Sequence, residues 1–280
     1  MRRQLVSLVL LVILALVASS CGDDGDTAST DAPTTTAGDT TTTAAETTTT
    51  TAAPDPLTIL ITNDDGVAAE GIDALVEMLR TVDGVEIVVV APDGNRSGSS
   101  DSTTDDGSVT AAEATTLSGF PAIAVSGFPA DAVIHALDVV GIVPDLVISG
   151  INDGANIGPF TDLSGTVGAA RTAARAGYPA LAASQGLGEP ADFETGASLV
   201  EAWLADHIDE LRAGTDPFVD SINIPTCVEG EVRGVVEVPV ATDFADRDPL
   251  SSDCTSDATE PVDDVGAVTV GFASLAELTY

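Results

Sequence analysis

The chain has 280 residues, of which 45 are acidic and 9 are basic, all nine of them arginine, so its formal net charge is −36 at neutral pH. A surface of this charge repels polyanions, which excludes nucleic-acid polymers and anionic membrane faces as binding partners. An anionic small molecule remains possible as a substrate if a cation at its site reverses the local field.

The first 21 residues are typical of an export signal. Arg2 and Arg3 precede an apolar run over 5–17, and small residues then lead to Cys21. The run is too short for a membrane span, and a cysteine in this place resembles the lipidated cysteine of a bacterial lipobox. We expect an exported lipoprotein, anchored on the extracytoplasmic side of a membrane only through a lipidated Cys21. Ordinary secretion and an uncleaved anchor are the alternatives.

Residues 22–56 are mainly Thr, Ala, Asp and Pro. They carry too little apolar surface to offset the entropy of ordering, which predicts a disordered tether. The stretch 57–280 is long enough for one α/β domain with a core of its own. It holds Cys227 and Cys254, and such a pair in an exported protein favours a disulfide over free thiols or metal ligands.

The domain begins with a short apolar run, 57–61, that predicts a buried central strand. The run stops at Asn63-Asp64-Asp65-Gly66. Two adjacent carboxylates at the end of a buried strand repel each other and are costly to desolvate unless a cation lies between them. Ligands also collect at this end of open α/β sheets. A hard metal such as Mg²⁺ or Mn²⁺ is one interpretation, and a plain turn is the other.

A helix over 70–81 and a second buried strand over 86–92 follow. The loop after this strand contains Asn95, Arg96 and Ser97 and can face the same crevice as the aspartates. Ser97 offers a hydroxyl to a metal, while Asn95 and Arg96 offer donors to a phosphate. The alternative is a flexible Ser/Gly loop that binds nothing.

The middle of the chain continues the alternation of strands and helices. Residues 101–121 are polar and interrupt the alternation as an excursion, for which a hairpin is one interpretation. The pattern then predicts a strand over 122–125, a helix over 130–140 and a strand over 145–149. A glycine-rich loop over 150–158 comes next, and its backbone is exposed because positive φ is easy there. Within it, Asn152 offers a neutral amide oxygen to a hard cation.

Ser164, Gly165 and Thr166 stand at the start of a helix that runs to about residue 176. Free N–H groups and hydroxyls at a helix N-terminus favour an anion, while an ordinary helix cap is the alternative. The chain contains neither a Walker loop nor a GxGxxG fingerprint. Its two histidines, His135 and His207, stand far apart on predicted helices, which argues against a zinc site.

A strand over 179–184, a helix over 191–211 and a strand over 218–225 complete the pattern. Strands alternating with helices at this spacing predict an α/β fold with a doubly wound, mainly parallel sheet. The tail from 232 onward contains a strand-like VVEVPV and resembles an appended arm more than another βαβ unit.

Taken together, these stretches resemble the SurE family of survival-protein nucleotidases. The motifs that carry the resemblance are ILITNDDG, VVAPDGNRSGSS, GFPADAVIHAL, PDLVISGINDGANIG, LSGTVGAA and, more weakly, AVTVGFASLAEL. They occur in the order of the family and cover essentially all of 57–280. The resemblance implies a Rossmann-like domain with a C-terminal extension used in forming a homodimer or homotetramer. It also implies metal-dependent hydrolysis of nucleoside monophosphates.

The resemblance assigns roles to individual residues. Asp64 and Asp65 match the paired metal aspartates of the family, and Ser97 and Asn152 match its metal-contacting serine and asparagine. The positions that match those near the bound phosphate are Asn156, Ser164, Gly165 and Thr166. Two departures lie close to the site, because Asp153 replaces a usual basic residue and Leu163 replaces a usual aromatic one.

The expected function is therefore a metal-dependent 5'/3'-nucleotidase with Mn²⁺ or Mg²⁺ as the cofactor. The substrate is a small nucleotide, and one of the two aspartates takes a proton from the attacking water. An exported solute-binding lipoprotein and a catalytically inactive metal-binding module are the alternatives.

Overall fold

The computed structural model describes residues 55–105 and 107–280. The predicted export signal, Cys21 and almost all of the predicted tether lie outside the described residues. Within the described part of the chain, every helix is too short or too polar to cross a membrane.

The described residues form one nine-stranded sheet with the order β3-β4-β2-β1-β5-β6-β7-β9-β8. The strands are β1 Leu57–Thr62, β2 Val85–Pro92, β3 Ala111–Thr115, β4 Pro121–Val125, β5 Leu146–Asp153, β6 Ala180–Gln185, β7 Val219–Ile224, β8 Val235–Glu237 and β9 Ala273–Glu277. The six strands from β4 to β7 pair in parallel, whereas β3 pairs antiparallel with β4 and β9 antiparallel with β7. The predicted mainly parallel sheet is confirmed, and the excursion over 101–121 does contain one strand of a hairpin.

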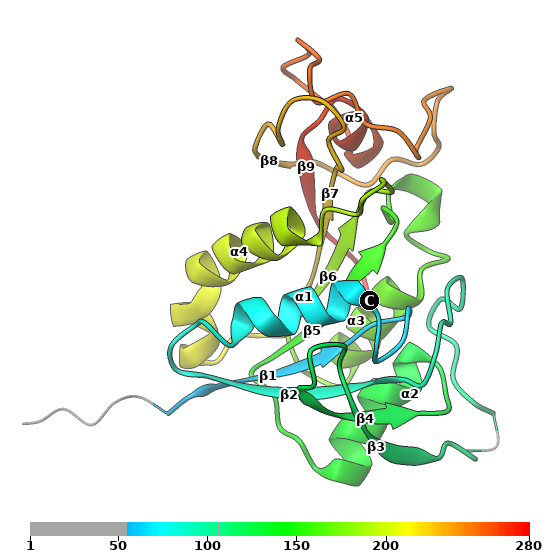
Figure 1. Cartoon of the computed structure of the whole chain (residues 1–280), viewed down its shortest axis with the longest axis vertical. Coiled ribbons are helices and arrows are strands. Elements are labelled where there is room, and N and C mark those ends of the chain that lie inside the picture. The colour runs from blue at the N-terminus through cyan, green and yellow to red at the C-terminus, as the bar shows by residue number, and fades with distance from the viewer. Residues whose placement is uncertain (1–54, 106) are drawn as a thin grey trace, which may run out of the picture. The chain divides into compact units, whose positions relative to one another are not determined.

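Helices cover both faces of the sheet, as a doubly wound fold requires (Figure 1). The helices are α1 Glu70–Leu79, α2 Pro129–Ile134 with a π-helical continuation over His135–Val140, α3 Gly165–Arg175, α4 Phe193–Ala213 and α5 Asp264–Thr269. Helices α1 and α4 pack together on one face, and α2 and α3 pack together on the other. The predicted Rossmann-like architecture is confirmed.

Strand β1 is central because it is apolar on both sides. Ile59 and Ile61 point into the core beneath α1 and α4, while Leu60 points into the core beneath α2 and α3. All three side chains are fully buried, which stabilises the fold by about 1.5–3 kcal/mol for each side chain. The strand lies between β2 and β5, so its carboxyl end opens in the middle of the sheet.

Strand β5 is longer than the sequence indicates, because it extends through Asp153 instead of ending at Ser149. The pairing with β6 shifts register between Ser149 and Asn152 and then resumes. Gly150 makes this irregularity possible, since its φ is +144° and a Cβ there would come within 2.3 Å of the Ala183 carbonyl oxygen. The resumed pairing places Asn152 on the sheet, where its position is fixed, and not on a free loop.

The hydrophobic pattern over 130–140 predicts a helix with Val133, Ile134, Leu137 and Val140 facing inward, and the structure corrects this for two of them. A regular α-helix would turn Ile134 and Val140 inward, but these side chains are 38% and 40% exposed. The helix widens to π-helical geometry from His135. The wider turn rotates the following residues relative to the α-helical period, so the inward stripe does not continue.

The tail extends the main sheet through β9 and β8. Strand β9 pairs antiparallel with β7, and β8 pairs with the outer side of β9. The predicted strand VVEVPV is shorter than expected and ends at Glu237. Helix α5 had no clear signal in the sequence because it has only six residues and depends on its cap, the Asp263 carboxylate, which accepts a hydrogen bond from the Gly266 N–H.

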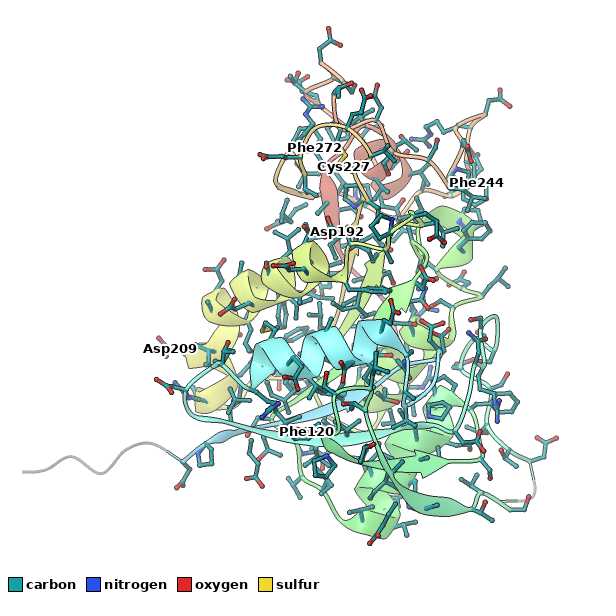
Figure 2. All side chains as sticks on the ribbon, viewed as in Figure 1. Phe120, Asp192, Asp209, Cys227, Phe244 and Phe272 are labelled. Atoms are coloured by element: carbon teal, nitrogen blue, oxygen red, sulfur yellow. A yellow bond between two sulfur atoms is a disulfide. The ribbon has the colours of Figure 1, made fainter. Side chains whose placement is uncertain are left out.

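A disulfide joins Cys227 to Cys254 with the two Cα atoms 5.7 Å apart, as the pair of cysteines predicts. Cys227, labelled in Figure 2, lies beyond the end of β7. Cys254 packs beside Gly271, where a Cβ would come within 2.6 Å of the Cys254 Cα. The bridge therefore ties the C-terminal segment to the end of the parallel sheet.

Replacing both cysteines by serine should lower the free energy of unfolding by about 3.5 kcal/mol, because the cross-link closes a loop with a sequence separation of 27 residues and restricts the unfolded chain. The melting temperature should then fall by about 7–14 °C. Thermal unfolding with and without reductant measures this, and the double variant, which has no bridge to reduce, is the control. Free thiols on the oxidised protein, detected by mass spectrometry, would contradict the expectation.

Candidate active site

The carboxyl end of β1 delivers Asp64 into a buried position beside the N-terminus of α3. The side chain of Asp64 is 2% exposed. Its Oδ1 accepts a hydrogen bond of 2.7 Å from the Thr166 hydroxyl, and the backbone groups of Gly165 and Thr166 also bond to this carboxylate. Burial raises the pKa of Asp64, and these hydrogen bonds oppose the rise. The anion at this helix N-terminus is thus the Asp64 side chain.

Helix α3 begins where it does because Ser164 caps it. The Ser164 Oγ accepts a hydrogen bond of 3.1 Å from the Val167 N–H, as N-cap residues commonly do. Gly165 permits the close approach to β1, since a Cβ there would come within 2.9 Å of the Asp64 Cβ and within 2.6 Å of the Ser99 Oγ. A larger residue at this position would push the aspartate away from the helix.

Asp65 is half-buried and held by two hydrogen bonds. Its Oδ1 accepts from the Asn95 Nδ2 and its Oδ2 from the Asp153 N–H, each at 3.0 Å. The pKa of Asp65 rises to about 6, chiefly because of burial, with smaller contributions from the negative charges of Asp64 and Asp153. The hydrogen bond from the Asp153 backbone acts in the opposite direction. Asp65 therefore has a proton affinity close to that of a general base working near neutral pH.

The loop after β2 supports the aspartates mainly through its backbone. The Arg96 N–H donates to the Asp64 carbonyl oxygen at 2.6 Å. The Arg96 guanidinium forms an ion pair of 2.6 Å with Asp93, so it has a partner other than a phosphate. The Asn95 Oδ1 accepts a hydrogen bond from the Ser97 backbone N–H at 3.0 Å. This bond does not involve the Ser97 hydroxyl, and Ser97 is exposed.

One pocket of about 320 Å³ gathers half of the residues proposed from the sequence. We call it the site pocket, and the predicted residues that line it are Asp64, Ser97, Asn152, Asn156 and Ser164. The other five predicted residues do not line the site pocket, but each of them contacts a residue that does. They are Asp65, Asn95, Arg96, Gly165 and Thr166. The structure thus separates pocket-lining residues from supporting ones.

Two asparagines are fixed in the site pocket, Asn152 near the end of β5 and Asn156 in the loop that follows. The Asn152 Nδ2 donates to the Gly154 carbonyl oxygen at 2.6 Å, which leaves the amide oxygen as the free acceptor of this side chain. The Asn156 Nδ2 donates to the Ser184 Oγ at 2.8 Å, and the Asn156 N–H donates to the Asn223 Oδ1 at 2.7 Å. Strands β6 and β7 therefore hold Asn156 in place.

The donor set of the site fits a hard divalent cation. Asp64 and Asp65 supply carboxylates, Ser97 a hydroxyl and Asn152 an amide oxygen, and such oxygen donors suit Mg²⁺ or Mn²⁺ better than a soft metal. Burial raises the pKa values of both aspartates, and a cation beside them would favour their ionised forms. Among the described residues, no group of three or more His, Cys, Asp or Glu side chains is placed to hold a metal ion. The proposed donors are two carboxylates and two neutral oxygens.

The histidines take no part in the site, as expected. The His207 ring stacks on the Trp203 ring with centroids 4.2 Å apart, and its Nδ1 lies 2.7 Å from the Trp203 carbonyl oxygen. His135 is the first residue of the π-helical turn beyond α2. Neither histidine lines the site pocket.

An apolar wall of the site pocket was not evident from the sequence. Its large side chains are Phe160, Leu163, Leu187 and Leu250. The three leucines are 58%, 48% and 59% exposed, which is a high exposure for side chains that favour the interior. They come from three separate loops, so only their meeting at one pocket reveals them. The one sequence signal that could have indicated this wall is the presence of isolated leucines in otherwise polar loops.

A larger cavity of about 510 Å³ lies on the other side of Asp65. Its acidic lining residues are Asp65, Glu70, Asp153 and Glu189. It includes neither of the neutral oxygen donors, Ser97 and Asn152, and it does not reach the N-terminus of α3. The smaller site pocket is therefore the better candidate for binding an anionic substrate.

The fold is that of a Rossmann-like α/β protein. Its central strand leads into Asp64 and Asp65, which lie beside a capped helix N-terminus. Residues 59–247 match the family described as "Survival protein SurE". The chain belongs to the SurE family.

Curated relatives and a solved structure agree with this assignment. The chain is 34% identical over 246 residues to "5'-nucleotidase SurE" from Synechococcus sp. (strain JA-3-3Ab), covering 79% of this chain and 91% of the relative. It is 34% identical over 238 residues to "5'/3'-nucleotidase SurE" from Yersinia pseudotuberculosis, covering 79% and 89%. The crystal structure of the SurE protein from Aquifex aeolicus superposes with a TM-score of 0.64 at 29% identity, covering 79% and 92%.

Proposed function

We propose that this chain hydrolyses nucleoside monophosphates to nucleoside and phosphate, with Mn²⁺ or Mg²⁺ held by Asp64, Asp65, Ser97 and Asn152. As a SurE protein the chain is a phosphatase of the nucleotidase class that acts on a small-molecule nucleotide, and its family is generally metal-dependent. The observation that carries the proposal is the pair formed by buried Asp64 and half-buried Asp65. Asp64 shares one pocket with Ser97, Asn152 and the capped helix start at Ser164.

The chemistry divides between the cation and the side chains. A divalent cation, when bound, neutralises phosphate charge and acidifies water. Asp65, with a pKa near 6, accepts a proton from the attacking water. Thr166 and the N-terminus of α3 orient Asp64, and their hydrogen bonds oppose the rise in its pKa that burial causes. Asn156 and Ser164, which line the pocket, contact the phosphate oxygens.

The apolar wall of the site pocket suits the nucleoside half of such a substrate. Leu163, Leu187 and Leu250 present hydrocarbon surface next to the polar end of the same pocket. Water leaves this surface when the sugar and base bind, which favours binding. A solute-binding lipoprotein would need two similar lobes, whereas the described residues form one sheet.

We also propose that the protein is exported and anchored outside the cytoplasm through Cys21, and that it assembles as a homodimer or homotetramer through the C-terminal extension. The support is the composition of residues 1–21 and the position of β8 and β9 at the edge of the sheet, with β8 outermost. An edge strand offers unpaired backbone groups to a second copy.

The direct test of the proposed function is phosphate release from AMP, GMP, CMP and UMP by the full chain with Mn²⁺ or Mg²⁺, before and after treatment with EDTA. Turnover that EDTA abolishes supports a metal-dependent nucleotidase. Metal binding without turnover on any of the four nucleotides would favour the inactive metal-binding module.

Raising the NaCl concentration should increase kcat/KM for AMP several-fold. The formal charge of −36 repels the nucleotide over about 30 Å at 0.01 M salt, but only over about 8 Å at 0.15 M. The contacts inside the site pocket act at short range, so kcat should change little. Steady-state kinetics against NaCl at saturating Mn²⁺ measures both constants. A steady fall of kcat/KM over this range would mean that a local positive field outweighs the net charge.

A further inference from the structure

The loop that leads from β5 to α3 carries six lining residues of the site pocket. We call residues 154–164 the site loop, and Asn156 and Ser164 are the two of its lining residues that are proposed to contact the phosphate. Asn156 is tied to β6 and β7, and Ser164 is tied to α3. Between these points the site loop lies against the C-terminal segment, so that segment influences its course.

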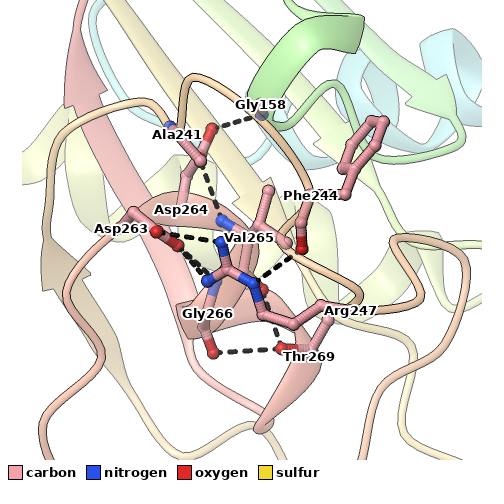
Figure 3. A network of polar contacts seen from close by, with 9 residues as sticks. All are labelled: Gly158, Ala241, Phe244, Arg247, Asp263, Asp264, Val265, Gly266 and Thr269. Carbon is pink, nitrogen blue, oxygen red and sulfur yellow. Dashed lines mark hydrogen bonds and ion pairs between the residues drawn. The ribbon is translucent and has the colours of Figure 1, made fainter.

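The main polar contact comes from Asp264, the first residue of α5, which is 1% exposed. Its Oδ2 accepts a hydrogen bond of 2.8 Å from the Gly158 N–H in the site loop. Its Oδ1 accepts from the Ala241 and Val265 N–H groups, each also at 2.8 Å. Figure 3 shows the carboxylate between Gly158 and the chain around Ala241. Three backbone donors hold it in a single orientation.

Apolar contacts reinforce the same junction. Ile157 is fully buried in a small cluster with Ala241, Val265 and other residues of the C-terminal segment. A Cβ at Gly158, where φ is +52°, would come within 2.9 Å of the Val265 Cγ2. The Phe160 ring lies 4.8 Å from the Phe244 ring, centroid to centroid. The middle of the site loop is therefore packed against residues about 80 to 110 positions further along the chain.

We propose that Asp264 is a positioning residue for the reaction: its hydrogen bond to the Gly158 N–H holds the site loop so that Asn156 and Ser164 face the phosphate. This inference rests on the proposed function. Asp264 does not line the site pocket and acts only through the backbone of the loop. The metal-binding aspartates belong to the end of β1 and do not depend on this hydrogen bond.

Asp264→Asn is the informative variant because of the donors around the side chain. An asparagine keeps one acceptor oxygen, and pointing it at Ala241 and Val265 preserves two of the three hydrogen bonds. The amide NH₂ then faces the Gly158 N–H, so a donor meets a donor. The variant therefore breaks the contact with the site loop while leaving the other contacts in place.

The adjacent residue provides a matched control. Asp263 caps α5 through the Gly266 N–H at 2.7 Å and pairs with Arg247, whose NH2 lies 3.0 Å from its Oδ2 (Figure 3). These contacts lie within the C-terminal segment. Asp263→Asn thus perturbs the same helix with the same chemical change, but without touching the site loop.

The experiment compares the two variants with the full wild-type chain in three measurements. For Asp264→Asn, hydrogen exchange in the peptide covering 154–164 should accelerate at least about tenfold. The inhibition constant of inorganic phosphate should rise and kcat should fall, each about tenfold or more. The Mn²⁺ concentration for half-maximal activity should not change. For Asp263→Asn, all of these values should stay within about twofold of wild type, even if its melting temperature falls.

Equal exchange and equal phosphate inhibition in the two variants would overturn the positioning role, because a merely structural carboxylate would affect both alike. Hydrogen exchange needs no turnover, so an inactive wild type would count against the proposed function while the loop measurement still decides this inference. If Asp264→Asn does not fold, Phe244→Leu removes the ring that packs on Phe160. Exchange in the site loop and phosphate inhibition should then rise, and unchanged values would overturn the inference.

Discussion

Asp64→Asn and Asp65→Asn should each lower kcat by about 10²–10⁴-fold while leaving the fold intact. Asp64 is buried beside Thr166 and the N-terminus of α3, so its negative charge is held where a cation is needed. Asp65 has a pKa of about 6 and is the proton acceptor of the proposed mechanism. An amide at either position removes both the charge and the basicity but keeps the shape of the side chain.

The fold should tolerate these changes because the metal-free site gains nothing from its ionised carboxylates. The pKa of Asp65 rises from an ordinary value of 3.8 to about 6 in the folded chain. Its contribution to stability is therefore full below about pH 4 and is lost as the pH rises through 6. At pH 8 without metal, Asp65→Asn should thus melt at the same temperature as wild type or higher.

The matched control is Asp209→Asn, which changes an exposed aspartate on α4 that is labelled in Figure 2. Steady-state turnover of AMP and circular dichroism melting curves should be measured for all three variants. Wild-type turnover in Asp64→Asn or Asp65→Asn would remove that aspartate from the mechanism. A large loss of turnover in Asp209→Asn would show that the effect is not specific to the site.

The second large effect concerns the metal. Removal of divalent cations should abolish turnover, and Mn²⁺ or Mg²⁺ should restore it, because Asp64 and Asp65 need a positive charge between them to act on an anionic phosphate. The affinity for the cation should also depend on pH. Below about pH 6 a proton occupies Asp65 and competes with the metal, so the apparent dissociation constant should rise about tenfold for each further pH unit.

Calorimetric titration of the metal-free protein with Mn²⁺ between pH 5 and pH 8 tests this directly, without relying on turnover. The affinity should be nearly constant above pH 7 and should weaken towards pH 5. Asp65→Asn is the control, since it should bind Mn²⁺ more weakly and with a shallower pH dependence. An affinity that is the same at pH 5 and pH 8 in the wild type would show that Asp65 is not a ligand.

Local features of the sequence were enough to predict the framework of the fold. The apolar run over 57–61 could only be a buried strand, because both of its faces are hydrophobic, and the turn residues after it mark where that strand ends. The alternation of strands and helices predicts a parallel sheet because parallel neighbours need a crossover connection. The motifs around Asp64, Ser97 and Asn152 located the polar wall of the site pocket. These signals are local in sequence, so no knowledge of distant contacts was needed.

The tertiary structure decided which groups meet. Thr166 donates to Asp64 across 102 positions, and Arg96 pairs with Asp93 instead of facing the pocket. Leu250 reaches the apolar wall from the C-terminal segment, and Asp264 bonds to Gly158 across 106 positions. Hydrophobic periodicity reports only whether a residue is buried. The partner of a buried polar group depends on how the helices and loops pack over the sheet, and that packing is settled by the whole chain at once.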